Sequence, residues 1–177
     1  MRSREVRKRP SRQPAAAPPP AEGTNTGGRS PQVGGRAFVV AAAGASRAAA
    51  RAWAATAAAR RAGVEVRSIE RSEWFVELAA YRFILSPIGS GIQRTANIEA
   101  LLVLTVPILE RCPYPVADDM VSMGFPVVVV GAWEEVTRER LKEWWSTFSP
   151  RLASFRAHCL TTQGYWHLLT GLVQRCT

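Results

Sequence analysis

The sequence has few of the residues that define common small functional sites. Its cysteines, Cys112, Cys159 and Cys176, are only three in 177 residues. They are too few and too scattered for a disulfide scaffold, and no CxxC or Cys/His cluster indicates zinc. Two of the three could pair in an oxidising compartment, and the odd number leaves at least one thiol free. The cysteines therefore leave the compartment undecided.

Long apolar runs and clustered catalytic residues are also absent. No stretch reaches the length of a membrane span, and the basic start leads into Ser, Pro, Gln and Ala rather than an apolar signal core. His158 and His167 stand apart from any carboxylate or nucleophile pattern, so the sequence assigns no catalytic residue. Asp118 and Asp119 are adjacent rather than spaced as D-x-D, so we predict no metal. The lack of a long apolar run predicts no transmembrane helix in this chain.

The net charge of +9 is concentrated in the first 36 residues. Residues 1–36 hold eight basic and two acidic side chains, a net charge of +6, and the remainder holds fifteen against twelve, a net charge of +3. Basicity that lies mainly in a tail is weak evidence for a nucleic-acid-binding fold, so we expect no nucleic-acid partner.

The composition divides the chain into a tail and one domain. Residues 1–36 include APPPA and GTNTGGRSPQVGGR and have too little apolar surface to offset their ordering entropy, which predicts disorder. An organelle transit peptide, a polyanion-binding arm and a solvated tail or misplaced start all remain open for this segment. Residues 37–177 have the length of a common single domain.

Within residues 37–177, short apolar runs alternate with helical patterns. Strands are predicted at 37–41, 64–69, 82–85, 106–109 and 127–130, and helices at 47–61, 73–80, 95–104, 117–123, after Thr137, from Ser149-Pro150 and at 165–173. This alternation predicts an α/β fold with a Rossmann-like, mostly parallel sheet flanked by helices. Ligands of such sheets bind at the carboxyl ends of the strands.

One of those strand ends carries a glycine loop. The run ending at Ser86 leads into Gly89, Ser90 and Gly91, and Thr95 is an expected N-cap of the next helix. A loop of this kind and a helix N-terminus can together receive a phosphate, although the sequence is neither a Walker A motif nor a GxGxxG fingerprint. Glycine loops also serve as plain turns, so both interpretations stay open.

Charged residues near this loop have two interpretations each. Glu99 is the sole charge on a helix that is otherwise apolar, where it either bonds ligand hydroxyls or sits near the first turn facing water. Arg94 lies between the loop and that helix. Arg47 and Arg51, one turn apart near the start of the first helix, either pair with a diphosphate or form an exposed cationic face.

An ordered set of segments resembles the C-terminal part of exostosin-like glycosyltransferases. The set is SPIGSGI, IEALLVLTVPIL, GFPVVVVGAWEEVT and LKEWW, between about residues 74 and 145. The resemblance implies the C-terminal domain of a GT-B glycosyltransferase, with two facing Rossmann-like domains, a nucleotide-sugar donor and, commonly, a Golgi location. It also implies that Glu99, in the family's E-A-L element, binds the donor ribose. Many members carry an Asp and a His-Arg or Tyr-Arg pair where this sequence has Gln93, Thr95 and Ala96.

The expected function is therefore glycosyl transfer from a nucleotide sugar to a glycan or glycoprotein acceptor. Residues 1–36 could not form the acceptor domain of such a transferase. The chain is therefore expected to be a donor-binding half, a fragment or a degenerate copy of a transferase. A non-catalytic α/β binding or interaction domain is the main alternative. A nucleotide-using enzyme of another type is a third, favoured only by the general sheet-and-loop pattern.

Overall fold

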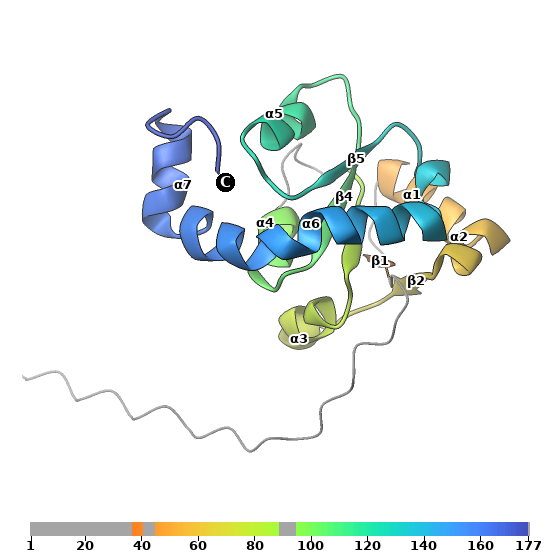
Figure 1. Cartoon of the computed structure of the whole chain (residues 1–177). Helices are drawn as coiled ribbons and strands as arrows, with labels where there is room; N and C mark the ends of the chain where they lie inside the picture. The colour runs from red at the N-terminus through yellow and green to blue at the C-terminus, as the bar shows by residue number, and fades with distance from the viewer. Residues whose placement is uncertain (1–36, 41–44, 89–94, 177) are drawn as a thin grey trace, which may run out of the picture. The chain divides into compact units, whose positions relative to one another are not determined.

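A computed structural model describes residues 37–40, 45–88 and 95–176. They form a five-stranded, all-parallel sheet in the order β2-β1-β3-β4-β5 (Figure 1). The strands are β1 (Ala37–Val40), β2 (Val64–Arg67), β3 (Phe83–Ser86), β4 (Val106–Glu110) and β5 (Val128–Val130). The predicted Rossmann-like sheet is confirmed, with β2 at an edge as expected. The expectations for the tail 1–36 and for Gly89, Ser90, Gly91 and Arg94 lie outside the described residues.

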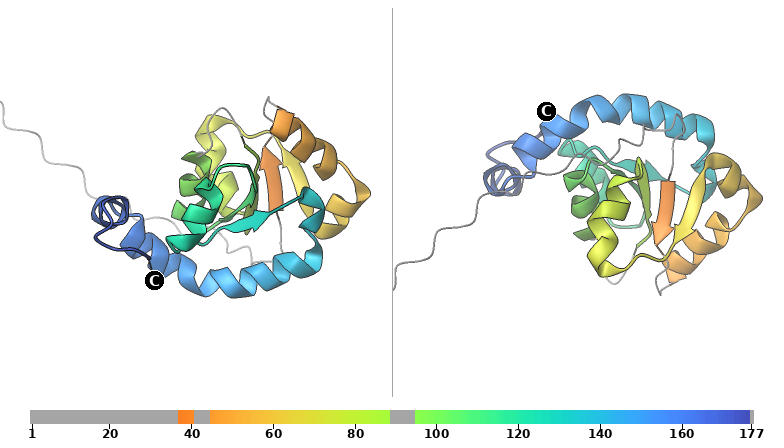
Figure 2. Two further views of the ribbon diagram at one scale, coloured as in Figure 1. Left: turned by 90° about the horizontal axis from the view of Figure 1, so that it is seen from above. Right: turned by 90° about the horizontal axis from the view of Figure 1, so that it is seen from below.

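Helices cover both faces of the sheet (Figure 2). Alternate residues of a strand point to opposite faces, so Val39 and Leu85 pack in the larger core with residues of α1, α2 and α6. Phe38 and Ile84 pack in the smaller core with residues of α3 and α4. The helices are α1 (Ala45–Ala54), α2 (Ala57–Ala62), α3 (Trp74–Ala79), α4 (Thr95–Leu102), α5 (Val116–Ser122), α6 (Arg138–Cys159) and α7 (Thr162–Leu169). Short 3₁₀ turns, η1 (Arg71–Glu73) and η2 (Trp133–Glu135), precede α3 and α6.

The strand order places a topological switch point between β1 and β3. The chain moves from β1 outward to β2 and then returns past β1 to β3, β4 and β5. The crevice at such a point lies outside the carboxyl ends of the strands and is the usual ligand position of doubly wound folds. Because β3 leads into α4, the first turn of α4 lies at this edge of the sheet.

The single helix predicted over 47–61 is wrong, since two helices occupy this stretch. Thr56, in an extended conformation, interrupts the helix and accepts a hydrogen bond from the backbone N–H of Ala59 through its side chain. A threonine oxygen at an N-cap competes with the helical backbone bond, which explains the break. Gly63 ends α2 with a φ of 89°, as its position predicted.

A new helix beginning at Ser149-Pro150 is also wrong, because α6 runs through Pro150 without ending. Proline removes one intrahelical hydrogen bond. Leu141, Leu152 and Phe155, on both sides of Pro150, are all buried in the larger core. Packing along this face therefore outweighs the local cost of the proline. Thr137 caps α6 as expected, accepting from the N–H of Arg140.

Two other helices have ends that differ from the prediction by two or more residues. The helix expected through Leu104 ends at Leu102, and Leu104 turns the chain with a φ of 65°. The last helix was expected over 165–173, but α7 begins at Thr162 and ends at Leu169. Thr161 supplies the N-cap, accepting from the N–H of Gly164 at 3.0 Å. A threonine that accepts in this way fixes the helix start upstream of its apolar residues.

Candidate functional site

A groove of about 650 Å³ lies between the first half of α4 and α7. Thr95, Ile98 and Glu99 form the α4 side. Residues at the end of α6 and along α7 form the other side, namely Leu160, Thr161, Thr162, Tyr165, Trp166 and Leu169. The volume is in the range of small-molecule sites, and a mostly apolar lining with a few polar groups is typical of them. The groove therefore holds two of the predicted site residues, Thr95 and Glu99.

The carboxylate of Glu99 is fixed by a tryptophan. Trp74 Nε1 donates to Glu99 Oε2 at 2.9 Å, and the ring of Trp74 packs edge-on against Phe38. Glu99 is the fifth residue of α4 and directly follows its first turn, where it is half-buried rather than fully exposed to water. One oxygen thus has a structural partner, while the half-buried residue still lines the groove.

Ser86 lies in a second, much smaller cavity of about 20 Å³ at the carboxyl ends of β3 and β4. Ser86 Oγ and Asn97 Oδ1 are buried there without a hydrogen-bond partner among the described residues. Glu110, also on this cavity, accepts from Ser46 Oγ at 2.8 Å. Burying a polar atom costs free energy unless a water, a ligand or another group forms a hydrogen bond with it. This strand edge is therefore a polar site separate from the groove, and α4 contributes Asn97 to it.

Arg47 and Arg51 lie on α1 and line neither the groove nor the small cavity. The hydrogen bond from Ser46 to Glu110 places the first turn of α1 beside the end of β4. Arg51 Nε is buried with no hydrogen-bond partner among the described residues. The structure thus joins Thr95 and Glu99 in one groove, has Ser86 in the small cavity, and leaves both arginines outside the two.

The strand end after β5 is occupied by a side chain of the protein itself. Glu135 Oε1 accepts from the backbone N–H groups of Gly131 and Ala132, and Glu135 Oε2 pairs with Arg140 at 3.0 Å. The hydrogen bonds from Ala132 and Gly131, followed by the charge of Arg140, lower the pKa of Glu135 below 4.5. Backbone N–H groups that could face an anion here are already satisfied, so the loop 131–135 is structural.

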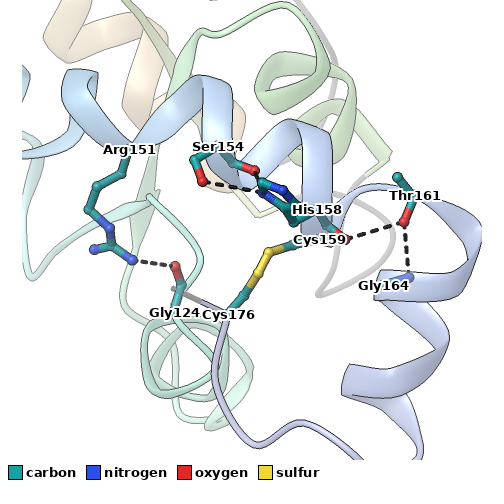
Figure 3. The surroundings of a disulfide bond; sticks show 8 residues. All are labelled: Gly124, Arg151, Ser154, His158, Cys159, Thr161, Gly164 and Cys176. Atoms are coloured by element: carbon teal, nitrogen blue, oxygen red, sulfur yellow. Dashed lines mark hydrogen bonds between the residues drawn. A yellow bond between two sulfur atoms is a disulfide. The ribbon is translucent and has the colours of Figure 1, made fainter.

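The wall formed by α7 is tied to the end of α6 by a disulfide between Cys159 and Cys176 (Figure 3). Cys112 is free and half-buried, so the expectation of at least one free thiol is confirmed. Figure 3 shows the C-terminal segment reaching the bridge beside Gly124, with Thr161 and Gly164 at the start of α7.

Several residues of the groove and the small cavity were not predicted from the sequence. Tyr165 and Trp166 were visible as adjacent aromatics at the start of the last helix, and Thr161 as an N-cap residue. Asn97 could have been noticed as a polar residue on an apolar helix. Nothing in the local pattern connects Trp166 with Glu99, because the two lie on helices far apart in the chain.

A scan against protein-family models found no match to this chain, and a search of curated proteins found none either. The fold defines an α/β protein with a Rossmann-like, all-parallel sheet. None of the helices in the described ranges combines the length and hydropathy that a membrane span requires. No cluster of three potential metal ligands occurs in the described part of the chain.

Proposed function

We propose that this chain is the nucleotide-sugar-binding domain of an exostosin-like glycosyltransferase, acting in glycosyl transfer to a glycan acceptor. The observation that carries the proposal is the position of Glu99, which lies on the wall of a ligand-sized groove beside α4, the helix that follows β3 in a doubly wound sheet. The first turn of α4 follows the carboxyl end of β3, and such folds bind nucleotides at the carboxyl ends of their strands.

The groove offers separate surfaces for the parts of a nucleoside diphosphate. The rings of Tyr165 and Trp166 suit a nucleobase, since stacking of a base on an aromatic side chain contributes about 1–3 kcal/mol. The Glu99 carboxylate suits the ribose hydroxyls as an acceptor. Thr95 begins α4, and backbone N–H groups at a helix N-terminus favour an anion such as a diphosphate.

Trp74 supports this role by orienting the carboxylate. One oxygen of Glu99 accepts from the Trp74 indole, which leaves the other oxygen for ligand hydroxyls. A carboxylate held by a neighbouring donor loses less rotamer freedom when a ligand binds, and such preorganisation strengthens binding. The Cys159–Cys176 disulfide fits a protein of an oxidising compartment, where such transferases act.

Calorimetric titration of the folded protein with UDP and with GDP tests the proposal. We expect saturable heat with one of them, and weaker binding for Trp166→Ala, which removes the stacking surface. The exposed Gln163, on the same helix but outside the groove lining, gives the matched control Gln163→Ala. Absence of heat at millimolar nucleotide, with the protein shown to be folded, would contradict a donor site. Binding of UDP-sugars without hydrolysis or transfer would favour the non-catalytic alternative.

A further inference from the structure

One wall of the groove is a helix with little burial of its own. Of the large apolar side chains on α7 and just after it, Trp166 is 61% exposed, Leu169 63% and Leu172 72%. Leu168 is the residue of α7 that is buried in the core. Segments with few buried apolar contacts open locally at low free-energy cost. The position of α7 therefore depends on what holds its two ends.

The first end is fixed by close backbone packing on α6. A Cβ atom at Gly164 would overlap the carbonyl oxygen of His158 and lie 3.0 Å from Cys159 Cα. Thr161 Oγ1 donates to the same carbonyl oxygen at 3.2 Å (Figure 3). The start of α7 thus lies directly against the last turn of α6.

The second end is fixed through the C-terminal segment. The N–H of Cys176 donates to the carbonyl of Met123 at 2.9 Å. The carbonyl of Cys176 approaches Gly124, which has a φ of 89° and no side chain to prevent the contact. Arg151 holds the carbonyl of Gly124 from the α6 side at 3.1 Å. Cys176 is then joined by the disulfide to Cys159, which closes a loop that contains all of α7.

We propose that the groove stays assembled only while Cys159 and Cys176 are joined, so that reduction of this disulfide releases its α7 wall. A small dithiol supplies the electrons. Its thiolate attacks one sulfur, which releases the other cysteine and gives a mixed disulfide. Its second thiol then closes a ring and releases the remaining cysteine. Two electrons and two protons pass to the protein, and the dithiol becomes a cyclic disulfide. The release of α7 on reduction does not depend on which ligand the groove binds. The further expectation that reduction abolishes nucleotide binding rests on the proposed function.

The bridge is separated from the remaining cysteine and from solvent. Cys159 is 1% exposed and Cys176 8% exposed, so a thiolate reaches either sulfur only when the C-terminal segment lifts from Gly124. Cys112 lies on the small cavity at the ends of β3 and β4, and its Sγ contacts the Tyr114 carbonyl. Cys112→Ser is therefore a control that removes a thiol without touching the bridge.

Hydrogen exchange followed by mass spectrometry, with and without dithiothreitol, tests the proposal on the full chain. We expect one reactive thiol in the denatured, oxidised protein and three after reduction, given three cysteines of which Cys112 is free. On reduction, exchange in peptides covering 162–169 should accelerate by at least about 10-fold, while the strands stay protected. Unchanged exchange in α7, equal loss of protection in the sheet, or three thiols before reduction would each overturn the proposal.

Two variants and one ligand measurement sharpen the result. Cys176→Ser should reproduce the fast exchange of α7 without reductant, and Cys112→Ser should respond to dithiothreitol like the natural chain. A Cys176→Ser protein whose sheet also loses protection would count against a local effect. Titration of UDP before and after reduction separates the two proposals. If the oxidised protein does not bind UDP but α7 exchanges faster after reduction, the proposed function alone is refuted. If the oxidised protein binds UDP but α7 stays protected after reduction, this inference alone is refuted.

Discussion

Replacing Glu99 by glutamine separates a ligand contact from a structural one. Glutamine keeps the length and shape of the side chain and removes its charge. Its carbonyl oxygen can still accept from Trp74 Nε1, which donates to Glu99 Oε2 at 2.9 Å. The substitution therefore preserves the bond to the tryptophan and changes mainly what the groove presents to a ligand.

The two interpretations predict effects on different quantities. If the other oxygen of Glu99 accepts hydrogen bonds from ribose hydroxyls, Glu99→Gln weakens the binding free energy by about 1.5–3 kcal/mol, the range for hydrogen bonds to a charged group. This corresponds to a rise in Kd of about 10- to 150-fold. If Glu99 serves only Trp74, the bond changes from charged to neutral. The free energy of unfolding then falls by about 1 kcal/mol and the nucleotide affinity stays level.

Trp74→Phe provides the matched comparison, because it removes the indole N–H and leaves the carboxylate in place. A ligand role predicts that Trp74→Phe lowers stability and reduces affinity much less than Glu99→Gln does. Urea unfolding gives the stability and calorimetric titration with UDP and GDP gives the affinity, both on the same protein. Unchanged affinity in Glu99→Gln together with lowered stability would refute the assignment of Glu99 to the ligand.

Three further substitutions test other parts of the fold. Gly164→Ala should lower the free energy of unfolding by about 1–3 kcal/mol, because its Cβ would overlap the carbonyl of His158; urea unfolding with Gln163→Ala as control measures this, and equal stability of the two would contradict it. Pro150→Ala should raise the free energy of unfolding by about 1–3 kcal/mol by restoring a helical hydrogen bond in α6, and no gain in urea unfolding would contradict a net cost of this proline. Because the pKa of Glu135 is lowered on folding, its charge contributes stability above pH 4.5 that is lost as the pH falls through the lower, folded pKa. Since the side chain of Glu135 is 36% exposed, this contribution stays below about 1 kcal/mol. Glu135→Gln should remove this loss of stability at acidic pH. If the variant and the natural chain show the same pH profile in urea unfolding, the assigned role of Glu135 is refuted.

The order of strands and helices was predictable because burial leaves a local record in the sequence. The runs at Ala37–Val40 and Val128–Val130 are short, apolar and rich in valine, as strands covered on both faces are. Glycine at 63 and threonine at 137 and 161 mark helix ends through hydrogen bonds that span only a few residues. Where tertiary packing opposes a local signal, as at Pro150, the sequence pattern predicts the wrong boundary.

The site depended on contacts that no local pattern contains. Glu99 and Thr95 could be selected from the sequence as polar residues on an apolar helix after a glycine loop. Their position opposite Tyr165 and Trp166, and the bond of Glu99 to Trp74, required the fold. Arg47 and Arg51 were selected on the same grounds of charge and spacing, and they lie outside the groove.

By itself, then, the sequence determined where the strands and most of the helices form, since these follow from periodicity, capping and chain stiffness over a few residues. The tertiary structure alone decided that α7 folds back beside α4, that Cys159 rather than Cys112 joins Cys176, and that Ser46 reaches Glu110. Those pairings bring together residues far apart in the chain. They depend on how whole helices pack on a sheet of given strand order, and that packing is a property of all the elements at once.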